Sequence, residues 1–240
     1  MATDQKRDLL AEGKTKIIWQ DPDDPEAVIV ENKSDITAHD NPDLTRRFEK
    51  KSEYATTTTC RVFELLKVCG VPTAYLSQVS TTEFRALKSK MVPLECVGRR
   101  LGVGSYLMRH PELMIADPKK PHRFHRLVTE LFLKTTGRKF KGILADLPCD
   151  DPLIINPDDK IWNLAHPKKP AWDYDNGKLV WAKPIATIDS NKVLPASFLE
   201  SQGIDSVGRT LRRTFYVLEK AWGILDRTLV DFKLEFDESG

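Results

Sequence analysis

Several features that would assign a chain to a class at first reading are missing from this sequence. The four cysteines are scattered without a CxxC pair, which is typical of a reducing cytoplasm and argues against a disulfide framework or a zinc site. The amino terminus, MATDQKRDLL, lacks the apolar segment of a secretory signal. No apolar run approaches the roughly 20 residues that a membrane-spanning helix needs. These absences predict a cytoplasmic protein that does not enter a membrane.

An excess of charge of one sign is missing too. Lys and Arg total 37 and Asp and Glu total 35, which gives a formal net charge of +2. This balance gives no support for a general nucleic-acid or membrane-surface binder. Any anion that the protein binds must therefore be held by a local cluster of basic side chains. The 240 residues are enough for one large domain or two small ones.

Familiar catalytic and metal motifs are incomplete or absent. EGKTK at 12–16 contains the GKT of a P-loop, but Asp8 stands where that motif needs glycine. His122 and His125 form an HxxH pair without a neighbouring cysteine or a clear helical context, so we interpret both as surface residues. No Ser-His-Asp or Cys-His arrangement can be argued from spacing.

The amino-terminal part predicts a small antiparallel sheet with one helix packed on it. KTKIIWQ at 14–20 and AVIVEN at 27–32 flank a DPDDP turn and are expected to be paired strands. A helix is expected at 48–69, with Gly70 ending it. Further strands are expected at 73–78, 81–90 and 91–100.

In the rest of the chain, segments with a clear helix or strand pattern flank one long stretch without such a pattern. Residues 135–195 are rich in Pro, Asp, Lys and Trp and predict long loops with short strands. A helix follows, with Asp205 or Ser206 as the expected N-cap. The other expected elements are a short helix within 102–113, a strand at 128–134, the helix at 204–222 and a closing strand at 228–236.

Two lysines near the start are a candidate polyphosphate site. On one strand, Lys14 and Lys16 would share a face with their ammonium groups about 7 Å apart. That spacing can straddle a polyphosphate. A solvated strand face is the alternative, and the residues alone leave both open.

The stretch ECVGRRLGVGS is a candidate anion site. Gly102 and Gly104 leave backbone N–H groups open, and Ser105 lies where a helix begins, which favours a phosphate. Arg99 and Arg100 can add planar charge-assisted contacts. A glycine turn beside two surface arginines is the alternative.

The closing strand carries Asp231, Lys233 and Glu235 on one face, opposite an apolar face. Facing a cleft, the carboxylates could hold Mg²⁺ while the lysine meets phosphate oxygens. Open to water, the same row would form ion pairs of little energetic value. The residues alone leave both readings open.

Taken together, these stretches resemble the phosphoribosylaminoimidazole-succinocarboxamide synthase (SAICAR synthase) family. The resemblance covers nearly the whole chain, and the first strand, the arginine–glycine–serine turn and the DxKxE strand are specific to the family in combination. The matching segments, in the family's order, are EGKTK, SDITAHD at 34–40, MVPLECVGRRLGVGS at 91–105, ELFLK at 130–134 and LVDFKLEF at 229–236.

The resemblance implies an α+β fold of two lobes with the ATP cleft between them. An antiparallel β-rich lobe, 1–92, would lie over a larger α+β lobe, 93–240. The implied reaction joins L-aspartate to carboxyaminoimidazole ribotide (CAIR) with ATP and Mg²⁺, giving SAICAR, ADP and phosphate in purine biosynthesis. No nucleic-acid or membrane partner is implied, and a homo-oligomer is left open. The alternatives are a relative that binds nucleotide or a partner without turnover, and a kinase-like phosphotransferase acting on another small substrate.

The resemblance also implies which residues contact the nucleotide and the metal. Lys14 and Lys16 would bind the ATP phosphates. The segment from Met91 to Glu95 would form the hinge beside the adenine. Glu235 would bind Mg²⁺.

For the substrates, the resemblance implies that Arg99 and Ser105 hold the ribotide phosphate. Lys134 would line the catalytic centre. Asp231 and Lys233 would meet the imidazole substrate and the transferring phosphate. Such chemistry depends on positioning and charge neutralisation, so the missing nucleophile motif is no objection.

Three departures from the family pattern are visible. The TAG turn reads Thr-Ala-His-Asp at 37–40, and the acidic run expected after Lys134 is delayed until Asp150 and Asp151. Family members continue beyond the DxKxE strand with a second metal carboxylate and an arginine, whereas this sequence stops at Gly240. We therefore expect weak ATP binding and slow or no turnover from these 240 residues. If turnover is full, Asp40, Asp150 and Asp151 are the first substitutes to test for the carboxylate.

Overall fold

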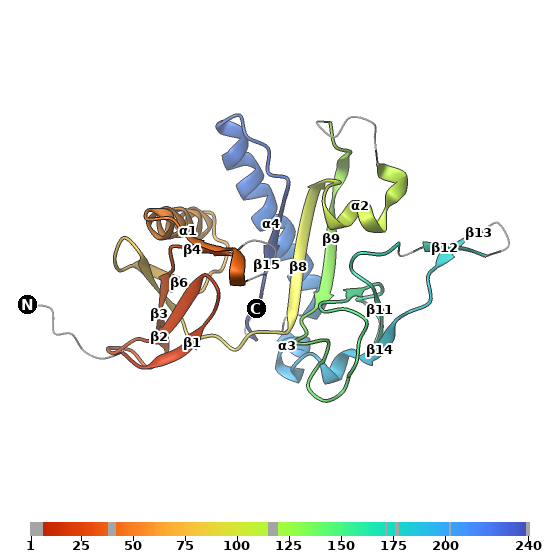
Figure 1. Ribbon diagram of the computed structural model, residues 1–240, viewed down its shortest axis with the longest axis horizontal. Coiled ribbons are helices and arrows are strands. Elements are labelled where there is room, and N and C mark those ends of the chain that lie inside the picture. Colours follow the sequence, from red (N-terminus) through yellow and green to blue (C-terminus); the bar gives the residue numbers. More distant parts are fainter. Residues whose placement is uncertain are drawn as a thin grey trace, which may run out of the picture. The chain divides into compact units, whose positions relative to one another are not determined.

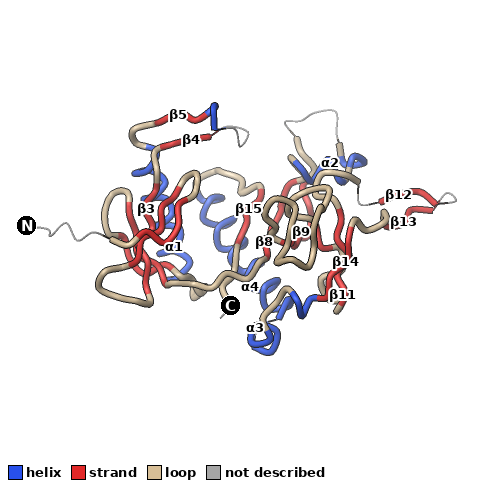
Figure 2. The backbone as a smooth tube through the Cα atoms, turned by 60° about the horizontal axis from the view of Figure 1, so that its bottom comes forward, coloured by secondary structure: helices blue, strands red, loops and turns tan. Residues whose placement is uncertain are grey.

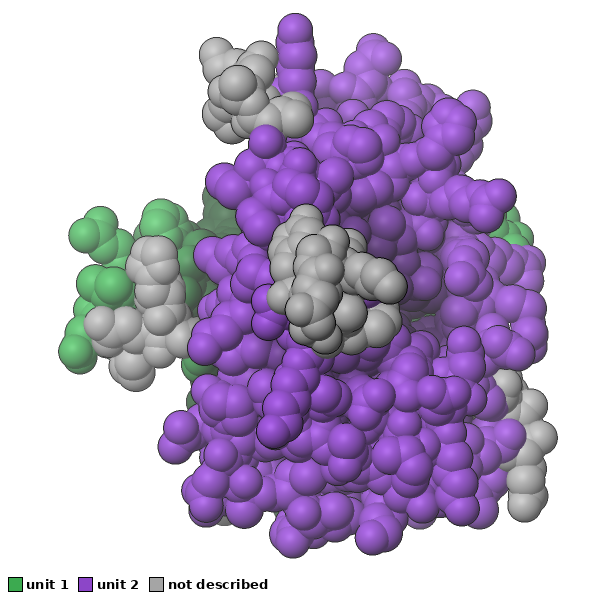
Figure 3. All heavy atoms as spheres, turned by 90° about the vertical axis from the view of Figure 1, so that its right-hand side faces the viewer, with its two compact units in different colours: residues 1–89 green, residues 90–240 purple. Residues whose placement is uncertain are grey.

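The computed structural model describes residues 7–37, 42–114, 120–170, 172–175, 178–201 and 203–238. Asp40 of the turn at 37–40 lies outside these residues, as does Gly240. The chain divides into two compact units, residues 1–89 and 90–240, drawn in green and purple in Figure 3. Among the described residues, no helix is both long enough and apolar enough to cross a membrane.

Unit 1 contains a five-stranded antiparallel sheet in the order β1-β2-β3-β7-β6 (Figure 1). Val28, Val30 and Phe84 of the sheet are buried with Cys60 of the helix α1. The prediction of a small sheet with one helix packed on it is confirmed. The bounds are β1 (Leu9–Glu12), β2 (Lys16–Gln20), β3 (Ala27–Asn32), β6 (Tyr75–Gln78), β7 (Glu83–Leu87) and α1 (Lys51–Val68).

Two details of unit 1 differ from or extend the sequence prediction. The helix begins at Lys51 rather than at residue 48, and Gly70 follows its end with a φ of +69°, the left-handed conformation that glycine adopts without strain. A separate hairpin precedes the helix (Figure 2). It consists of β4 (Asp35–Thr37), η1 (Pro42–Leu44) and β5 (Thr45–Arg47).

Unit 2 is built on a six-stranded antiparallel sheet in the order β14-β11-β10-β9-β8-β15. The strands are β8 (Leu94–Leu101), β9 (Arg123–Leu133), β10 (Leu153–Ile154), β11 (Ile161–Ala165), β14 (Ala186–Asp189) and β15 (Asp231–Leu234). The other elements are α2 (Ser105–Arg109), η2 (Pro111–Leu113), the hairpin β12 (Trp172–Asp175) and β13 (Lys178–Trp181), η3 (Ser190–Lys192), α3 (Ala196–Ser201) and α4 (Gly203–Ile224). The region 135–195 thus consists of loops with short strands, as predicted.

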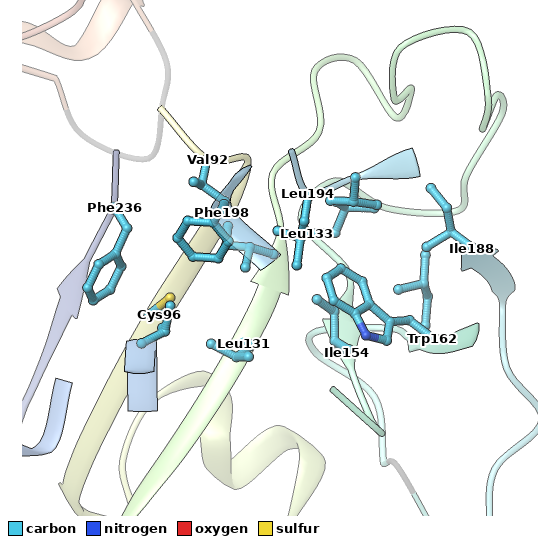
Figure 4. Packing of buried hydrophobic residues seen from close by; sticks show 14 of the residues in the cluster. Val92, Cys96, Leu131, Leu133, Ile154, Trp162, Ile188, Leu194, Phe198 and Phe236 are labelled. Atoms are coloured by element: carbon cyan, nitrogen blue, oxygen red, sulfur yellow. The ribbon is translucent and has the colours of Figure 1, made fainter. Parts of the chain in front are cut away.

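One face of this sheet packs into the main apolar core. Cys96, Leu131 and Leu133 come from the central strands, and Trp162 and Phe198 from the strand and helix beyond them (Figure 4). The helix α4 buries Val207, Leu211 and Phe215, which follow the predicted helical period. Its expected N-cap was wrong, because the helix already begins at Gly203 and Asp205 lies in its first turn.

The closing strand β15 is shorter than the predicted 228–236, but its flanks still bond to β8 and the segment before it. The backbone N–H of Arg100 donates to the carbonyl of Val230 at 2.9 Å, and that of Val92 donates to the carbonyl of Phe236 at 2.8 Å. This pairing fixes which β15 side chains face the core and which face away.

Candidate active site

The side of the sheet away from the core carries charged residues from three adjacent strands. Asp231 pairs with Arg99, and Lys233 pairs with Val97, across β15 and β8. Val97 in turn pairs with Glu130 on β9. Since alternate residues share a face, the charged row of β15 meets Glu95 and Arg99 of β8, while Cys96 and Gly98 face the core. The strand pattern noticed in the sequence is therefore one wall of a charged surface.

Four side chains form what we call the arginine cluster: Arg99, Arg109, Glu130 and Asp231. Arg99 donates from Nε to Glu130 Oε2 and from Nη1 to Asp231 Oδ2, both at 2.6 Å. Arg109 donates from Nη2 to the other oxygen of Glu130. The Arg99 and Glu130 side chains are 8% and 7% exposed, whereas Asp231 is 39% exposed. Asp231 is therefore the partner that solvent or a ligand can reach.

The turn that leads into α2 lies beside this cluster. Gly104 precedes the helix with a φ of +59°, a conformation that strains residues with a side chain. Ser105 begins α2, and its carbonyl accepts a hydrogen bond from Arg109 Nη1 at 3.2 Å. The Tyr106 ring lies against both guanidinium groups, with its centroid 5.8 Å from Cζ of Arg99 and 5.6 Å from that of Arg109.

A second group of four residues forms the lysine cluster: Glu95, Lys134, Lys233 and Glu235. Glu95 Oε1 accepts from Lys134 Nζ at 2.5 Å and from Lys233 Nζ at 2.7 Å. Glu235 Oε1 lies 3.2 Å and 3.4 Å from the same two ammonium groups. Two carboxylates from adjacent strands therefore share the same pair of cations.

The charges of the lysine cluster shift its protonation equilibria. Burial opposes ionisation of Glu95, but hydrogen bonds from Lys134 and Lys233 outweigh it and hold the pKa of Glu95 below its usual value. Burial likewise opposes the charge of Lys134, but Glu95 and Glu235 raise the pKa of that lysine. Both shifts favour the charged forms of Glu95 and Lys134, so this pair is held as an ion pair.

Asp150 and Asp151, the acidic residues that come later in the chain than the family pattern predicts, lie beside the end of β9. Thr135 follows Lys134, and its backbone N–H donates to Asp151 Oδ1 at 2.8 Å while its hydroxyl donates to Asp150 Oδ1 at 2.9 Å. The backbone N–H of Leu133 donates to the carbonyl of Pro152 at 3.0 Å. The intervening residues 136–149 therefore form a closed loop, which puts the acidic pair beside Thr135.

The two amino-terminal lysines lie in unit 1. The expectation that they share one strand face was wrong, because β2 begins at Lys16 and a turn closed by Gly13 N–H on the Lys16 carbonyl (2.9 Å) contains Lys14. Lys16 lines an open groove of about 1020 Å³ within unit 1, together with Arg47 and Lys50. Several basic side chains therefore line the same groove.

Other predicted positions can also be located. Met91 is half exposed and forms an isolated bridge with Asp237. Arg100 does not join Arg99 as expected. It points to the α4 side, where Nε and Nη2 donate to Glu219 at 2.7 Å and 2.8 Å. His122 and His125 are exposed, as predicted.

Sequence reasoning missed Glu130 and Arg109. Glu130 lies in a predicted strand among apolar residues, and only the register with β8 shows that it faces Arg99. Two signals were available for Glu130: its charge within the run VTELFLK and its place in the matching segment ELFLK. Arg109 gave no signal, because a basic residue at the end of a short helix is usually solvated.

Comparison with known proteins shows the family of this chain. The family model for SAICAR synthetase matches residues 9–139. The chain belongs to the SAICAR synthetase family. A phosphoribosylaminoimidazole-succinocarboxamide synthase of Chloroflexus aurantiacus is 35% identical over 230 residues, which cover 95% of this chain and 71% of that protein. A synthase of the same name from Roseiflexus castenholzii is 30% identical, covering 96% of this chain and 73% of that protein.

Solved structures of SAICAR synthetases share the fold. The Ehrlichia chaffeensis enzyme has a TM-score of 0.65 at 22% identity and covers 96% of this chain and 75% of that chain. A SAICAR synthetase solved in complex with ADP has a TM-score of 0.60 at 21% identity, with 96% and 75% covered. At these identities the likeness concerns the fold, and the predicted α+β class with antiparallel sheets is confirmed.

Proposed function

We propose that this chain is an ATP-dependent ligase that joins L-aspartate to the carboxylate of CAIR, giving SAICAR, ADP and phosphate. The observation that carries the proposal is the charged face of unit 2, where Arg99, Glu95 and the DxKxE residues meet on adjacent strands. A carboxylate oxygen of CAIR would attack the γ-phosphorus of ATP, with ADP leaving. The amine of aspartate would then attack the acyl carbon, losing a proton as phosphate departs. We place the reaction in the cytoplasm.

The ribotide phosphate is assigned to Arg99 and Ser105. Arg99 is a planar donor whose outer partner, Asp231, is reachable by a ligand. Ser105 begins α2 after a glycine turn, and Arg109 links its carbonyl to the same cluster. A dianionic phosphate can replace Asp231 on Arg99, which would free that carboxylate to accept a hydrogen bond from the imidazole part of the substrate.

The reacting centre is assigned to Lys134 and Lys233. Both ammonium groups contact Glu95 and are about half exposed. When phosphate oxygens arrive, the ammonium groups can donate to them and stabilise the charge that develops during transfer.

Magnesium is assigned to Glu235, with Glu95 as the second carboxylate. The described residues hold no cluster of three or more His, Cys, Asp and Glu side chains suited to a metal. Mg²⁺, however, is commonly held by one or two carboxylates together with phosphate oxygens. Glu95 and Glu235 each direct one carboxylate oxygen at the same two ammonium groups, so together they offer a cation two hard oxygen ligands. When bound, Mg²⁺ supplies neutralisation of charge on the transferring phosphoryl group.

The ATP phosphates are assigned to Lys14 and Lys16. The hinge beside the adenine is assigned to the backbone of the segment from Met91 to Glu95, because the Glu95 side chain is directed to Lys134 and Lys233. The groove beside Lys16 supports the phosphate part of this assignment, because Arg47 and Lys50 also line it. A polyphosphate would be neutralised there by several basic side chains. The hinge role of Met91 rests on the family pattern.

Substrate omission tests the proposed function. ATP turnover should require both CAIR and L-aspartate, and ADP should appear in a one-to-one ratio with SAICAR. Turnover that needs another acceptor and no aspartate would favour a phosphotransferase. Nucleotide binding with no turnover under any combination would favour a binding protein.

A further inference from the structure

Arg99 and Arg100 are consecutive arginines with separate glutamate partners on opposite faces of β8. Arg99 pairs with Glu130 on the charged face, and Arg100 pairs with Glu219 of α4. In the Arg100–Glu219 pair, the glutamate also lies 3.4 Å from Arg123, which is on the surface. The first continues inward to Arg109, whose side chain is fully buried. Only the first pair is thus tied to a second buried arginine.

Glu130 joins the two arginines through its two oxygens. Oε2 accepts from Nε of Arg99 at 2.6 Å, and Oε1 accepts from Nη2 of Arg109. With Asp231 on Nη1, the Arg99 guanidinium is held at two of its nitrogens. Because guanidinium is planar, two such contacts fix the orientation of the whole group.

Arg109 connects this array to the turn that carries Ser105. Its Nη1 donates to the Ser105 carbonyl at 3.2 Å and to the Pro167 carbonyl. The Tyr106 ring lies against the guanidinium groups of both arginines. Arg99 on its strand and Ser105 at the start of α2 are therefore linked through Glu130 and Arg109.

We propose that Glu130 and Arg109 are positioning residues that fix Arg99 relative to Ser105 for the ribotide phosphate. The inference rests on the proposed function, since it names the residues that shape the same phosphate site. The inner contacts with Glu130 stay in place when the ribotide binds, and the outer contact with the more exposed Asp231 is exchanged for the phosphate. Neither Glu130 nor Arg109 touches the reacting atoms.

The variant Glu130→Gln distinguishes a positioning role from a purely electrostatic one, because the two roles predict opposite changes in the affinity for the ribotide phosphate. Removing a negative charge beside Arg99 makes the site more positive, so a purely electrostatic role predicts tighter binding of a phosphate. Losing the carboxylate also leaves Arg99 and Arg109 repelling each other in one buried place, so a positioning role predicts weaker binding. We expect the KM for CAIR to rise about tenfold or more, the scale of one charge-assisted hydrogen bond, while the KM for ATP stays within about twofold.

Glu219→Gln is the matched control, because it also neutralises a glutamate that holds a β8 arginine. Thermal unfolding by circular dichroism is recorded for both variants. Glu219→Gln should lower the melting temperature and leave the KM for CAIR unchanged. If Glu130→Gln fails to fold, Arg109→Lys replaces it, since it keeps the charge of the cluster and removes only the planar fork. It should also raise the KM for CAIR selectively.

The outcomes separate the inference from the proposed function. If the wild-type chain neither binds nor converts CAIR, the proposed function fails. If the wild type converts CAIR but a folded Glu130→Gln or Arg109→Lys variant has an unchanged or lower KM for CAIR, the positioning inference is overturned. An equal rise in the Glu219→Gln control would overturn it as well.

Discussion

Arg99 and Asp231 are directly opposite each other on β8 and β15, and their side chains form an ion pair with an Nη1–Oδ2 distance of 2.6 Å. Because Asp231 is the exposed partner, it competes with any anion for Arg99. Asp231→Asn should therefore strengthen the binding of ribose 5-phosphate, used as a probe in calorimetry, by about threefold or more. It should also lower kcat/KM for CAIR by about a hundredfold, because the substrate contact is lost. Weaker binding of the probe would contradict this relationship.

Replacing Arg99 should weaken substrate binding, whereas replacing the adjacent Arg100 should lower stability. Arg99→Ala should raise the KM for CAIR by roughly 10- to 100-fold, the value of a charge-assisted hydrogen bond, with a much smaller change for ATP. Arg100→Ala should instead lower stability, because Glu219 and the rings of Phe215 and Tyr216 lose their partner. Steady-state kinetics and urea unfolding measure the two effects. Equal changes in both KM values for Arg99→Ala would count against the phosphate assignment.

The carboxylate pair of the lysine cluster should govern the metal requirement. Glu235→Gln and Glu95→Gln should each raise the Mg²⁺ concentration for half-maximal activity by about tenfold or more, since each replaces an anionic carboxylate ligand with a neutral amide. Glu31→Gln is a control on a carboxylate in unit 1 that accepts from Trp19. Mn²⁺ binding followed by electron paramagnetic resonance gives the same comparison without turnover. An effect in Glu235→Gln alone would remove Glu95 from the metal site.

Gly98 should be required for the packing of β8 against α4. A Cβ at this position would lie 3.0 Å from Cε1 of Phe232 and 3.2 Å from Cδ2 of Phe215, both ring atoms in the core. Gly98→Ala should lower the free energy of unfolding by about 1–3 kcal/mol, as overpacking does. Gly223→Ala, where a Cβ meets nothing within 4 Å, is the control and should be neutral or stabilising. Urea unfolding of the two variants decides this.

The Arg100–Glu219 pair should make stability depend on pH in acid. Hydrogen bonds from Arg100 hold the pKa of Glu219 below its usual value of 4.5. A carboxyl with a depressed pKa stabilises the fold above its unfolded pKa, and this stabilisation is lost as pH falls through the folded pKa. The free energy of unfolding of the wild type should exceed that of Glu219→Gln by about 1–3 kcal/mol at pH 7. This difference should shrink below about pH 4.5. A gap that is constant down to pH 3 would show that Glu219 contributes no such linkage.

The sequence predicted best those elements that pack one face against the core, because their apolar residues recur with a regular period. The alternation around Asp231 and the helical spacing from Ile204 predicted β15 and α4, since one side of each element packs against the core. Element ends were less certain. The expected N-cap at Asp205 or Ser206 was wrong because the helix extends back to Gly203.

The candidate site was only half visible in the sequence. Arg99, Ser105 and Lys233 belong to recognisable motifs, but their neighbours are set by strand register. Glu130 faces Arg99 because β9 pairs with β8 at this register, and a shift of one residue would turn it toward the core. The return of Asp150 to Thr135 is likewise a result of loop closure that spacing along the chain cannot show.

An oxygen-transfer experiment tests whether this chain is a ligase that acts through phosphoryl transfer to CAIR. CAIR labelled with ¹⁸O in its carboxylate is incubated with the chain, ATP, Mg²⁺ and L-aspartate, and the products are analysed by mass spectrometry. We expect each SAICAR formed to be accompanied by one inorganic phosphate that carries a single carboxylate ¹⁸O. Unlabelled phosphate, or labelled phosphate released without SAICAR, would contradict it.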